Sequence, residues 1–209
     1  MNSELPQIYL VRHGETAWSL SGRATGRTDL PLTDQGERAA QALGARLAGL
    51  KFDTVLTSPL QRARRTAELA GFGARAEIDA DLIEWDYGTY EGQRTADIRA
   101  KRPGWHLFEH GCPDGEPLQS IAIRADRVIE RLHALGGNAI LFAHWDILRI
   151  VATRWISLPA VEARHFFLTT ASVSILGYHH DLGEPVIRLW NDAAAAGHAL
   201  TAATAGIAL

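Results

Sequence analysis

The chain has 209 residues, with 21 Lys and Arg against 24 Asp and Glu and a single cysteine, Cys112. The length suffices for one α/β domain with a buried core, and the nearly balanced charge argues against a protein that binds nucleic acid through bulk electrostatics. One cysteine excludes an intrachain disulfide and a zinc site built on cysteines. No apolar run has the length of a membrane-spanning helix, and the N-terminal residues lack the pattern of a secretory signal. We therefore expect a cytoplasmic protein with no membrane or nucleic-acid partner.

The first apolar run, Ile8 to Val11, ends abruptly in Arg12, His13 and Gly14. Such a run predicts a buried strand of a parallel sheet, and ligands of open α/β sheets bind beyond the carboxyl ends of the strands. Arg12 offers a planar fork of donors to a phosphoryl group, and His13 can attack phosphorus. Taken alone, a strand-end histidine beside a surface arginine explains the same residues equally well.

The first half of the chain continues with alternating helical and strand patterns. We predict, in order, a loop-rich segment over residues 17–32, a helix after Thr33, a buried strand over 53–57, a helix over 60–70 and a short strand over 78–82. Thr33 is a suitable N-cap, and Pro59 suits the start of the following helix. Arg62 lies in that helix and can point toward the strand ends, although an exposed helix arginine is the simpler alternative.

The second half begins with residues 95–117, which Gly and Pro interrupt repeatedly, so we expect short helical turns that form a lid or rim. The predicted elements after it are a long helix from Leu118 to Gly136, a buried strand over 139–143, a helix over 147–155, and strands over 166–169, 173–178 and 186–190, some of them antiparallel. The strand over 139–143 ends in His144, as the first strand ends in His13. Adjacent parallel strands would bring these two histidines together.

These patterns predict a single-domain α/β fold, a three-layer sandwich with a mostly parallel sheet flanked by helices. The catalytic domain is expected over residues 1–192. Residues 193–209 form an alanine-rich tail to which we assign no role.

Several motifs follow one another in a characteristic order. They are Arg12-His13-Gly14-Glu15-Thr16, Thr25 to Thr33 with Gly36, Ser58-Pro59-Leu60 with Arg62-Ala63, Thr66-Ala67, Glu84 with Gly88 and Glu91-Gly92, and His144 with Arg149. With this set, which runs from about residue 7 to residue 155, the sequence resembles the histidine phosphatase superfamily, the phosphoglycerate mutase-like enzymes. The segments 22–33 and 143–154 look most like the branch that acts on sugar phosphates.

The resemblance implies a role for each matching residue. His13 would be the nucleophile that accepts the phosphoryl group, and Glu84 would give a proton to the leaving alcohol. Arg12, Arg62 and His144 would bind the phosphoryl oxygens. General chemistry agrees, because phosphoryl transfer through a loose transition state needs mainly positioning and positive charge. A neutral imidazole attacks only when its other nitrogen holds the proton, so we expect a carbonyl partner for His13.

The expected substrate-binding side also includes Ser19, Thr25, Gly26 and Trp145. The resembling enzymes often have Asn where Ser19 stands, and the serine side chain has a shorter reach. They usually have Gly after the second histidine, where this chain has Trp145, which either lines the pocket mouth or packs as an ordinary tryptophan. Asp86 is a second carboxylate that competes with Glu84 for the role of proton donor.

Glu116 gives a weak additional signal, since related enzymes have a substrate-side glutamate near this position. The other histidines have no spacing typical of metal ligands, and His179-His180 is interpreted as a strand-end pair.

The sequence thus predicts a metal-independent phosphatase without a cofactor, which hydrolyses a small phosphomonoester such as a sugar phosphate through a phosphohistidine on His13. A phosphoglycerate mutase is the first alternative, but such enzymes usually carry extra segments between the positions of Glu84 and His144, where this chain is short. A phosphate-binding protein that has lost turnover is the second alternative. The oligomeric state is left open, with a homodimer as one option.

Overall fold

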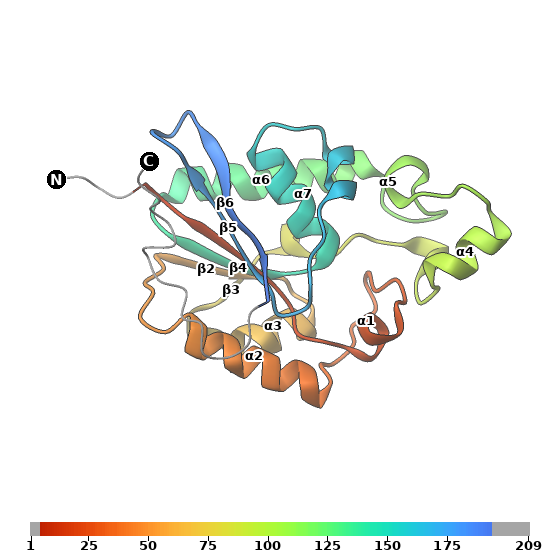
Figure 1. The fold of residues 1–209 in the computed structure, drawn as a ribbon, viewed down its shortest axis with the longest axis horizontal. Helices are drawn as coiled ribbons and strands as arrows, with labels where there is room; N and C mark the ends of the chain where they lie inside the picture. The colour runs from red at the N-terminus through yellow and green to blue at the C-terminus, as the bar shows by residue number, and fades with distance from the viewer. Residues whose placement is uncertain (1–4, 194–209) are drawn as a thin grey trace.

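A six-stranded sheet with the order β3-β2-β4-β1-β5-β6 runs through the computed structural model, which describes residues 5–193 (Figure 1). The strands are β1 (Ile8–Arg12), β2 (Thr54–Thr57), β3 (Glu77–Ile78), β4 (Ala139–Ala143), β5 (Val173–Tyr178) and β6 (Pro185–Asp192). β1, β4, β2 and β3 pair in parallel, whereas β5 is antiparallel to both β1 and β6. The sheet is mostly parallel with an antiparallel edge, as predicted.

Helices cover both faces of this sheet. The α-helices are α1 (Ala17–Ser21), α2 (Asp34–Arg46), α3 (Gln61–Leu69), α4 (Thr95–Lys101), α5 (Leu107–His110), α6 (Leu118–Leu135) and α7 (Trp145–Trp155). Short 3-10 helices span Gly73–Arg75, Ala80–Leu82, Gly88–Tyr90 and Ala160–His165. α6 and α7 lie on one face, and α2 and α3 lie on the other (Figure 1). The three-layer α/β architecture predicted from the sequence is confirmed.

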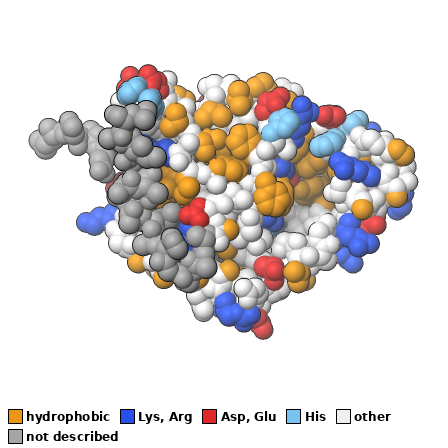
Figure 2. Space-filling model, viewed as in Figure 1, with side chains coloured by type: hydrophobic (Ala, Val, Ile, Leu, Met, Phe, Trp, Pro, Cys, Tyr) orange, Lys and Arg blue, Asp and Glu red, His pale blue; other side chains and the backbone are white. Residues whose placement is uncertain are grey.

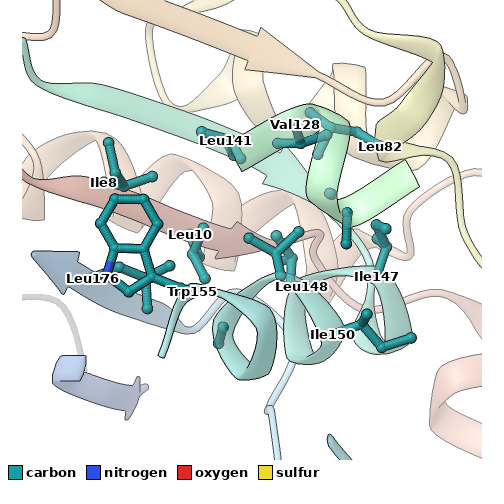
Figure 3. Packing of buried hydrophobic residues seen from close by; sticks show 14 of the residues in the cluster. Ile8, Leu10, Leu82, Val128, Leu141, Ile147, Leu148, Ile150, Trp155 and Leu176 are labelled. Atoms are coloured by element: carbon teal, nitrogen blue, oxygen red, sulfur yellow. The ribbon is translucent and has the colours of Figure 1, made fainter. Parts of the chain in front are cut away.

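The two faces of β1 explain why its sequence is apolar without interruption. Ile8 and Leu10 belong to the hydrophobic cluster on the side of α6 and α7, while Tyr9 and Val11 belong to the cluster on the side of α2 and α3. Side chains alternate between the faces of a strand, so a sheet covered on both sides needs apolar residues at every position. Figure 3 shows the first cluster, in which residues of the sheet pack against Ile147, Leu148, Ile150 and Trp155 of α7.

Two local predictions in the first half of the chain were incomplete. Residues 17–32, predicted as loop-rich, begin with the short helix α1, which Thr16 caps through a hydrogen bond to the backbone N–H of Ser19 at 3.2 Å. The strand predicted over 78–82 is limited to Glu77–Ile78. Asp79 then accepts a hydrogen bond from the backbone N–H of Asp81 at 2.9 Å, and this turn starts the 3-10 helix instead of a longer strand.

The strand predicted over residues 166–169 is wrong. The carbonyl groups of this segment accept hydrogen bonds from side chains instead of from a neighbouring strand. Arg149 donates to the carbonyl of Phe166 at 3.0 Å, Trp190 to that of Phe167 at 2.8 Å, and Arg12 to that of Leu168 at 2.6 Å. The other strand predictions for this part of the chain correspond to β5 and β6.

The parallel strands all point toward the side of the molecule where α1, α4 and α5 lie (Figure 1). The short helices α4 and α5 are the helical turns predicted over 95–117. The predicted tail lies outside the described residues from residue 194 onward, and the domain boundary at residue 192 stays a prediction.

Candidate active site

Two histidines lie side by side at the carboxyl edge of the parallel strands. Arg12 is opposite Ala143 in the pairing of β1 with β4, so His13 and His144 both follow directly after strand ends. The backbone N–H of His13 donates to the carbonyl of Ala143 at 3.0 Å, and the two imidazole centroids are 5.1 Å apart. The structure therefore confirms that neighbouring strands bring these histidines together.

The imidazole of His13 is held in one tautomer. Its Nδ1 lies 2.7 Å from the carbonyl oxygen of Gly14. Because a carbonyl only accepts, Nδ1 carries the proton and Nε2 keeps its lone pair. Burial, followed by the charges of Arg62 and Arg12, lowers the pKa of His13 well below its ordinary value. The side chain is neutral at neutral pH, and the expected carbonyl partner is present.

Gly14 lets the loop after β1 pack directly against the start of α2. A Cβ atom at residue 14 would lie 2.6 Å from the carbonyl oxygen of Gly36, and one at Gly36 would collide with the backbone of Glu15. The N–H of Gly14 donates to the hydroxyl of Thr66 on α3 at 3.0 Å. The carbonyl that orients His13 is thereby fixed by two helices.

Arg62 and His144 form a hydrogen-bonded pair behind the pocket. Nε of Arg62 donates to Nδ1 of His144 at 3.1 Å. The proton of the neutral imidazole is then on Nε2, which lies 2.7 Å from the hydroxyl of Ser58. Other guanidinium N–H groups of Arg62 donate to the carbonyls of Gly26 and Thr28 at 2.8 and 2.9 Å. In this arrangement Arg62 orients His144 and anchors the loop that contains Gly26 and Thr28. Neither Arg62 nor His144 lines the pocket.

Arg12 is buried beside His13 and supplies positive charge inside the pocket. One terminal nitrogen donates to the carbonyl of Leu168 at 2.6 Å, and the guanidinium carbon lies 4.5 Å from the ring centroid of Trp145. Its Nε is buried without a hydrogen-bond partner. Burial is the main cause that lowers the pKa of Arg12 to about 10, so the side chain is still charged at neutral pH. It is available to bind an anion.

Glu84 lies at the start of α7 and accepts hydrogen bonds from three backbone N–H groups. These are the N–H groups of Trp85 at 2.9 Å, Asp146 at 3.0 Å and Ile147 at 3.1 Å. Such bonds favour the carboxylate, yet burial and then the charge of Asp146 outweigh them and raise the pKa of Glu84 to about 7. At neutral pH the group therefore holds a proton part of the time, which suits an acid and base catalyst.

Asp86, the competing carboxylate, does not line the pocket. Its carboxylate accepts a hydrogen bond from the backbone N–H of Gly88 at 2.9 Å and so stabilises the loop. Glu116 is also outside the pocket, where it accepts hydrogen bonds from Arg124 at 2.7 and 2.8 Å. Of these carboxylates only Glu84 reaches the pocket, although its role stays a prediction.

Asp146 is a pocket residue that the sequence did not single out. It is fully buried, lines the pocket with Glu84, and accepts hydrogen bonds from the hydroxyl of Tyr87 and the guanidinium of Arg149. The available signal was its position, two residues after His144 in a helix whose other residues are almost all buried.

The expected substrate-binding residues differ in how they meet the pocket. Trp145, Ser19 and Thr25 line it, whereas Gly26 does not. The Trp145 ring packs edge-on against Phe167 with centroids 5.0 Å apart. The hydroxyl of Ser19 accepts a hydrogen bond from the backbone N–H of Thr16 in a capping box. The carbonyl of Gly26 accepts a hydrogen bond from Arg62.

A pocket of about 330 Å³ opens in front of His13 and Glu84, a size typical of small-molecule sites. Its outer wall comes mainly from α4, α5 and their connection, which supply the apolar residues Ile98, Trp105, Leu107 and Phe108 and the basic residues Arg99 and His106. Arg23, in the loop after α1, and Arg164, in the 3-10 helix Ala160–His165, add further basic lining. Figure 2 shows the surface hollowed on the side where α1, α4 and α5 lie. The expected rim over the site is confirmed.

Among residues 5–193, one group of three side chains could hold a metal ion, namely His179, His180 and Glu184. They are exposed in the turn between β5 and β6 and do not line the pocket. No helix in the described part of the chain is long and apolar enough to cross a membrane.

The sequence profile of the histidine phosphatase superfamily (branch 1) matches residues 8–193. The chain belongs to this superfamily. The match covers β1 through β6 and so includes the whole pocket.

Some relatives of this histidine phosphatase are named as phosphatases and others as mutases. It is 42% identical over 178 residues to the "Acid phosphatase" of Mycobacterium tuberculosis, covering 83% of this chain and 87% of the relative. It is 32% identical to the "Sedoheptulose 1,7-bisphosphatase" of Saccharomyces cerevisiae, over 90% and 94% of the two chains. It is 34% identical to the "Probable phosphoglycerate mutase GpmB" of Klebsiella pneumoniae, over 82% and 85%.

A solved structure supports the fold. The alpha-ribazole phosphatase of Shigella flexneri superposes with a TM-score of 0.78 at 28% identity, covering 90% of this chain and 98% of that one. The overall fold of this chain is therefore similar to that of a known phosphatase structure.

Proposed function

We propose that this histidine phosphatase hydrolyses a small phosphomonoester through a phosphohistidine on His13, with Glu84 as proton donor. The observation that carries the proposal is one pocket that holds a neutral His13 with a free Nε2 and a carboxyl group of pKa about 7. The acid phosphatase, bisphosphatase and alpha-ribazole phosphatase names of its relatives support hydrolysis of phosphorylated small molecules. A sugar phosphate or a related metabolite is the substrate class that we propose.

In the first step, Nε2 of His13 attacks phosphorus and the ester P–O bond breaks. The electron pair of that bond goes to the alcohol oxygen, which takes the proton of Glu84. The carbonyl of Gly14, bonded to Nδ1, stabilises the positive charge that the ring gains. Arg12 binds a phosphoryl oxygen and offsets the charge of the transition state.

In the second step, Glu84 is a carboxylate and removes a proton from water. The water oxygen attacks phosphorus, the P–N bond breaks, and its electron pair returns to Nε2 of His13. Inorganic phosphate leaves. A pKa near neutrality suits both duties, because the same group must give a proton and then take one within each turnover.

His144 is the donor that we assign to a second phosphoryl oxygen. Its Nε2–H is held by the hydroxyl of Ser58 in this structure, and exchange of that hydroxyl for a phosphoryl oxygen preserves one hydrogen bond. Arg62 keeps His144 in the required tautomer through its bond to Nδ1. Both residues then contribute to charge stabilisation without a metal ion.

A mutase is the second candidate, since one relative is named as such. A mutase must keep its phosphohistidine away from water while the intermediate reorients, which requires a closed cover. Only residues 85–143, 59 in all, separate Glu84 from His144, and α6 takes 18 of them. The cover that remains, chiefly α4 and α5, is short, which favours transfer to water.

The choice is tested with 3-phosphoglycerate and a panel of sugar phosphates in oxygen-18 water. We expect release of phosphate that carries one solvent oxygen, with little 2-phosphoglycerate. Efficient interconversion of the phosphoglycerates without phosphate release would establish the mutase. Binding of phosphate esters with no turnover of p-nitrophenyl phosphate would instead establish a binding protein.

A further inference from the structure

The outer wall of the pocket carries arginines without acidic partners. Arg23 and Arg99 both line the pocket and both side chains are exposed. Within residues 5–193 neither forms an ion pair. Among the described residues, the one side-chain hydrogen bond of Arg99 runs from Nε to the carbonyl of Trp105 at 3.0 Å, and both terminal nitrogens of its guanidinium group have no partner there.

The backbone holds these two arginines on neighbouring parts of the wall. Arg23 pairs with Arg94 in an isolated antiparallel bridge, and its N–H donates to the carbonyl of Trp18 at 3.0 Å. α4 begins at Thr95, directly after Arg94, and Arg99 is one helical turn further along. The bridge therefore ties the loop of Arg23 to the helix of Arg99.

The acidic groups of the pocket are already engaged elsewhere. Asp146 pairs with Arg149 and Tyr87, and Glu84 is bonded to backbone N–H groups. A third arginine on the wall, Arg164, is paired with Glu109 at 2.5 Å. Arg23 and Arg99 consequently add positive charge to the mouth of the pocket, and no carboxylate of the pocket offsets this charge.

We propose that Arg23 and Arg99 form a subsite for a second anionic group, a carboxylate or a phosphate, on the alcohol part of the substrate. The transferred phosphoryl group is placed at Arg12 and His13, so these outer arginines are not needed for it. Guanidinium groups with free terminal nitrogens bind carboxylate or phosphate through paired hydrogen bonds. The inference rests on the proposed phosphatase function and narrows its substrates to phosphomonoesters that carry another negative charge.

General attraction of anions to a basic rim is the competing explanation. A rim charge that only steers the phosphate raises the association rate for every phosphate ester and is screened by salt. A subsite acts selectively on substrates that have the second anion. Matched pairs of substrates separate the two effects.

The test compares 3-phosphoglycerate with glycerol 3-phosphate, which has a hydroxymethyl group in place of the carboxylate, and fructose 1,6-bisphosphate with fructose 6-phosphate. Phosphate release is measured for the wild type, Arg23→Gln, Arg99→Gln and the double variant. Arg102→Gln is the matched control, because Arg102 follows directly after α4, is exposed and lies outside the pocket. Turnover of p-nitrophenyl phosphate by the wild type tests the phosphatase function separately.

We expect each pocket variant to raise KM about tenfold for the substrate with the second anion, with little change for its partner and no change in Arg102→Gln. A selective loss in the phosphoglycerate pair alone assigns the subsite to a carboxylate, and one in the bisphosphate pair alone assigns it to a phosphate. Equal losses on both members of each pair, removed by salt, would overturn the subsite in favour of steering. Unchanged kinetics in the double variant would overturn it as well.

Discussion

The floor and the outer wall of the pocket are built in different ways. We define the floor as the side chains at the end of β1, which line the pocket, together with those directly behind them at the end of β4. They are buried and fixed by hydrogen bonds, as His13 is to Gly14 and His144 is to Arg62. The outer wall consists mainly of the short helices α4 and α5 and their connection, which expose Arg99 and His106. A sheet edge holds reacting groups rigidly, whereas short surface helices tolerate change. We infer that the floor carries the chemistry and the wall selects the substrate.

The largest effect is expected at the floor. His13→Ala removes the attacking nitrogen, so turnover should fall by more than about 10³-fold while the protein stays folded. His106→Ala in the outer wall should cost far less. Steady-state rates with p-nitrophenyl phosphate measure both, and circular dichroism checks folding.

A radiolabelled substrate gives a direct reading of the intermediate. Rapid quenching should trap acid-sensitive label on the wild type and none on His13→Ala. Near-normal activity in that variant would refute the covalent role, and with it the division between floor and wall.

Glu84→Gln should have the next largest effect, a loss of about 10²–10⁴-fold with alkyl phosphates. The loss should be smaller with p-nitrophenyl phosphate, because nitrophenolate leaves without a proton. Asp86→Asn is the control, since that carboxylate bonds the N–H of Gly88 away from the pocket. If Asp86→Asn showed the leaving-group dependence and Glu84→Gln did not, Asp86 would be the acid.

The floor was predictable because its causes are local. Uninterrupted apolar runs indicate strands buried on both faces, and the residue after such a run lies at the ligand-binding edge. That reasoning placed His13 and His144 correctly. It failed for residues 166–169, because the partners of those carbonyls, the side chains of Arg12, Arg149 and Trp190, are distant in the sequence.

Asp146 shows the same limit inside the site. An acidic residue in the first turn of a helix is ordinary, since it interacts favourably with the helix dipole. Its importance comes from Tyr87 and Arg149, which approach it only once α7 packs beside the loop after Glu84. The positions of Arg23 and Arg99 around the pocket depend in the same way on where α4 lies.

Asp146→Asn should have a moderate effect, visible mainly in the pH profile. The negative charge of Asp146 helps to raise the pKa of Glu84 to about 7. The first step needs protonated Glu84, so kcat/KM for an alkyl phosphate should fall as the pH rises above about 7. Removal of the charge lowers the pKa of Glu84, and this alkaline limb should move to lower pH.

Because wild type and variant are compared on one substrate, ionisation of the substrate affects both profiles equally. The asparagine keeps the size of the side chain, and the backbone N–H that bonds Glu84 is unchanged. A uniform loss of rate with no movement of the alkaline limb would show that Asp146 acts only by packing.

The smallest effect is expected from removal of metal ions. The positive charge of the floor comes from Arg12 and Arg62, and the neutral His144 adds a hydrogen-bond donor. EDTA should therefore leave kcat and KM unchanged, and added magnesium or zinc should not activate. The exposed group of His179, His180 and Glu184 could bind added zinc without contact with the pocket. The double variant His179→Ala, His180→Ala distinguishes zinc binding at this exposed group from a metal effect in the pocket. It should lose any zinc binding at the exposed group while its turnover equals that of the wild type. A strict metal requirement that persists in the double variant would mean that the floor contains an ion, and that its arginines and histidines serve a different chemistry.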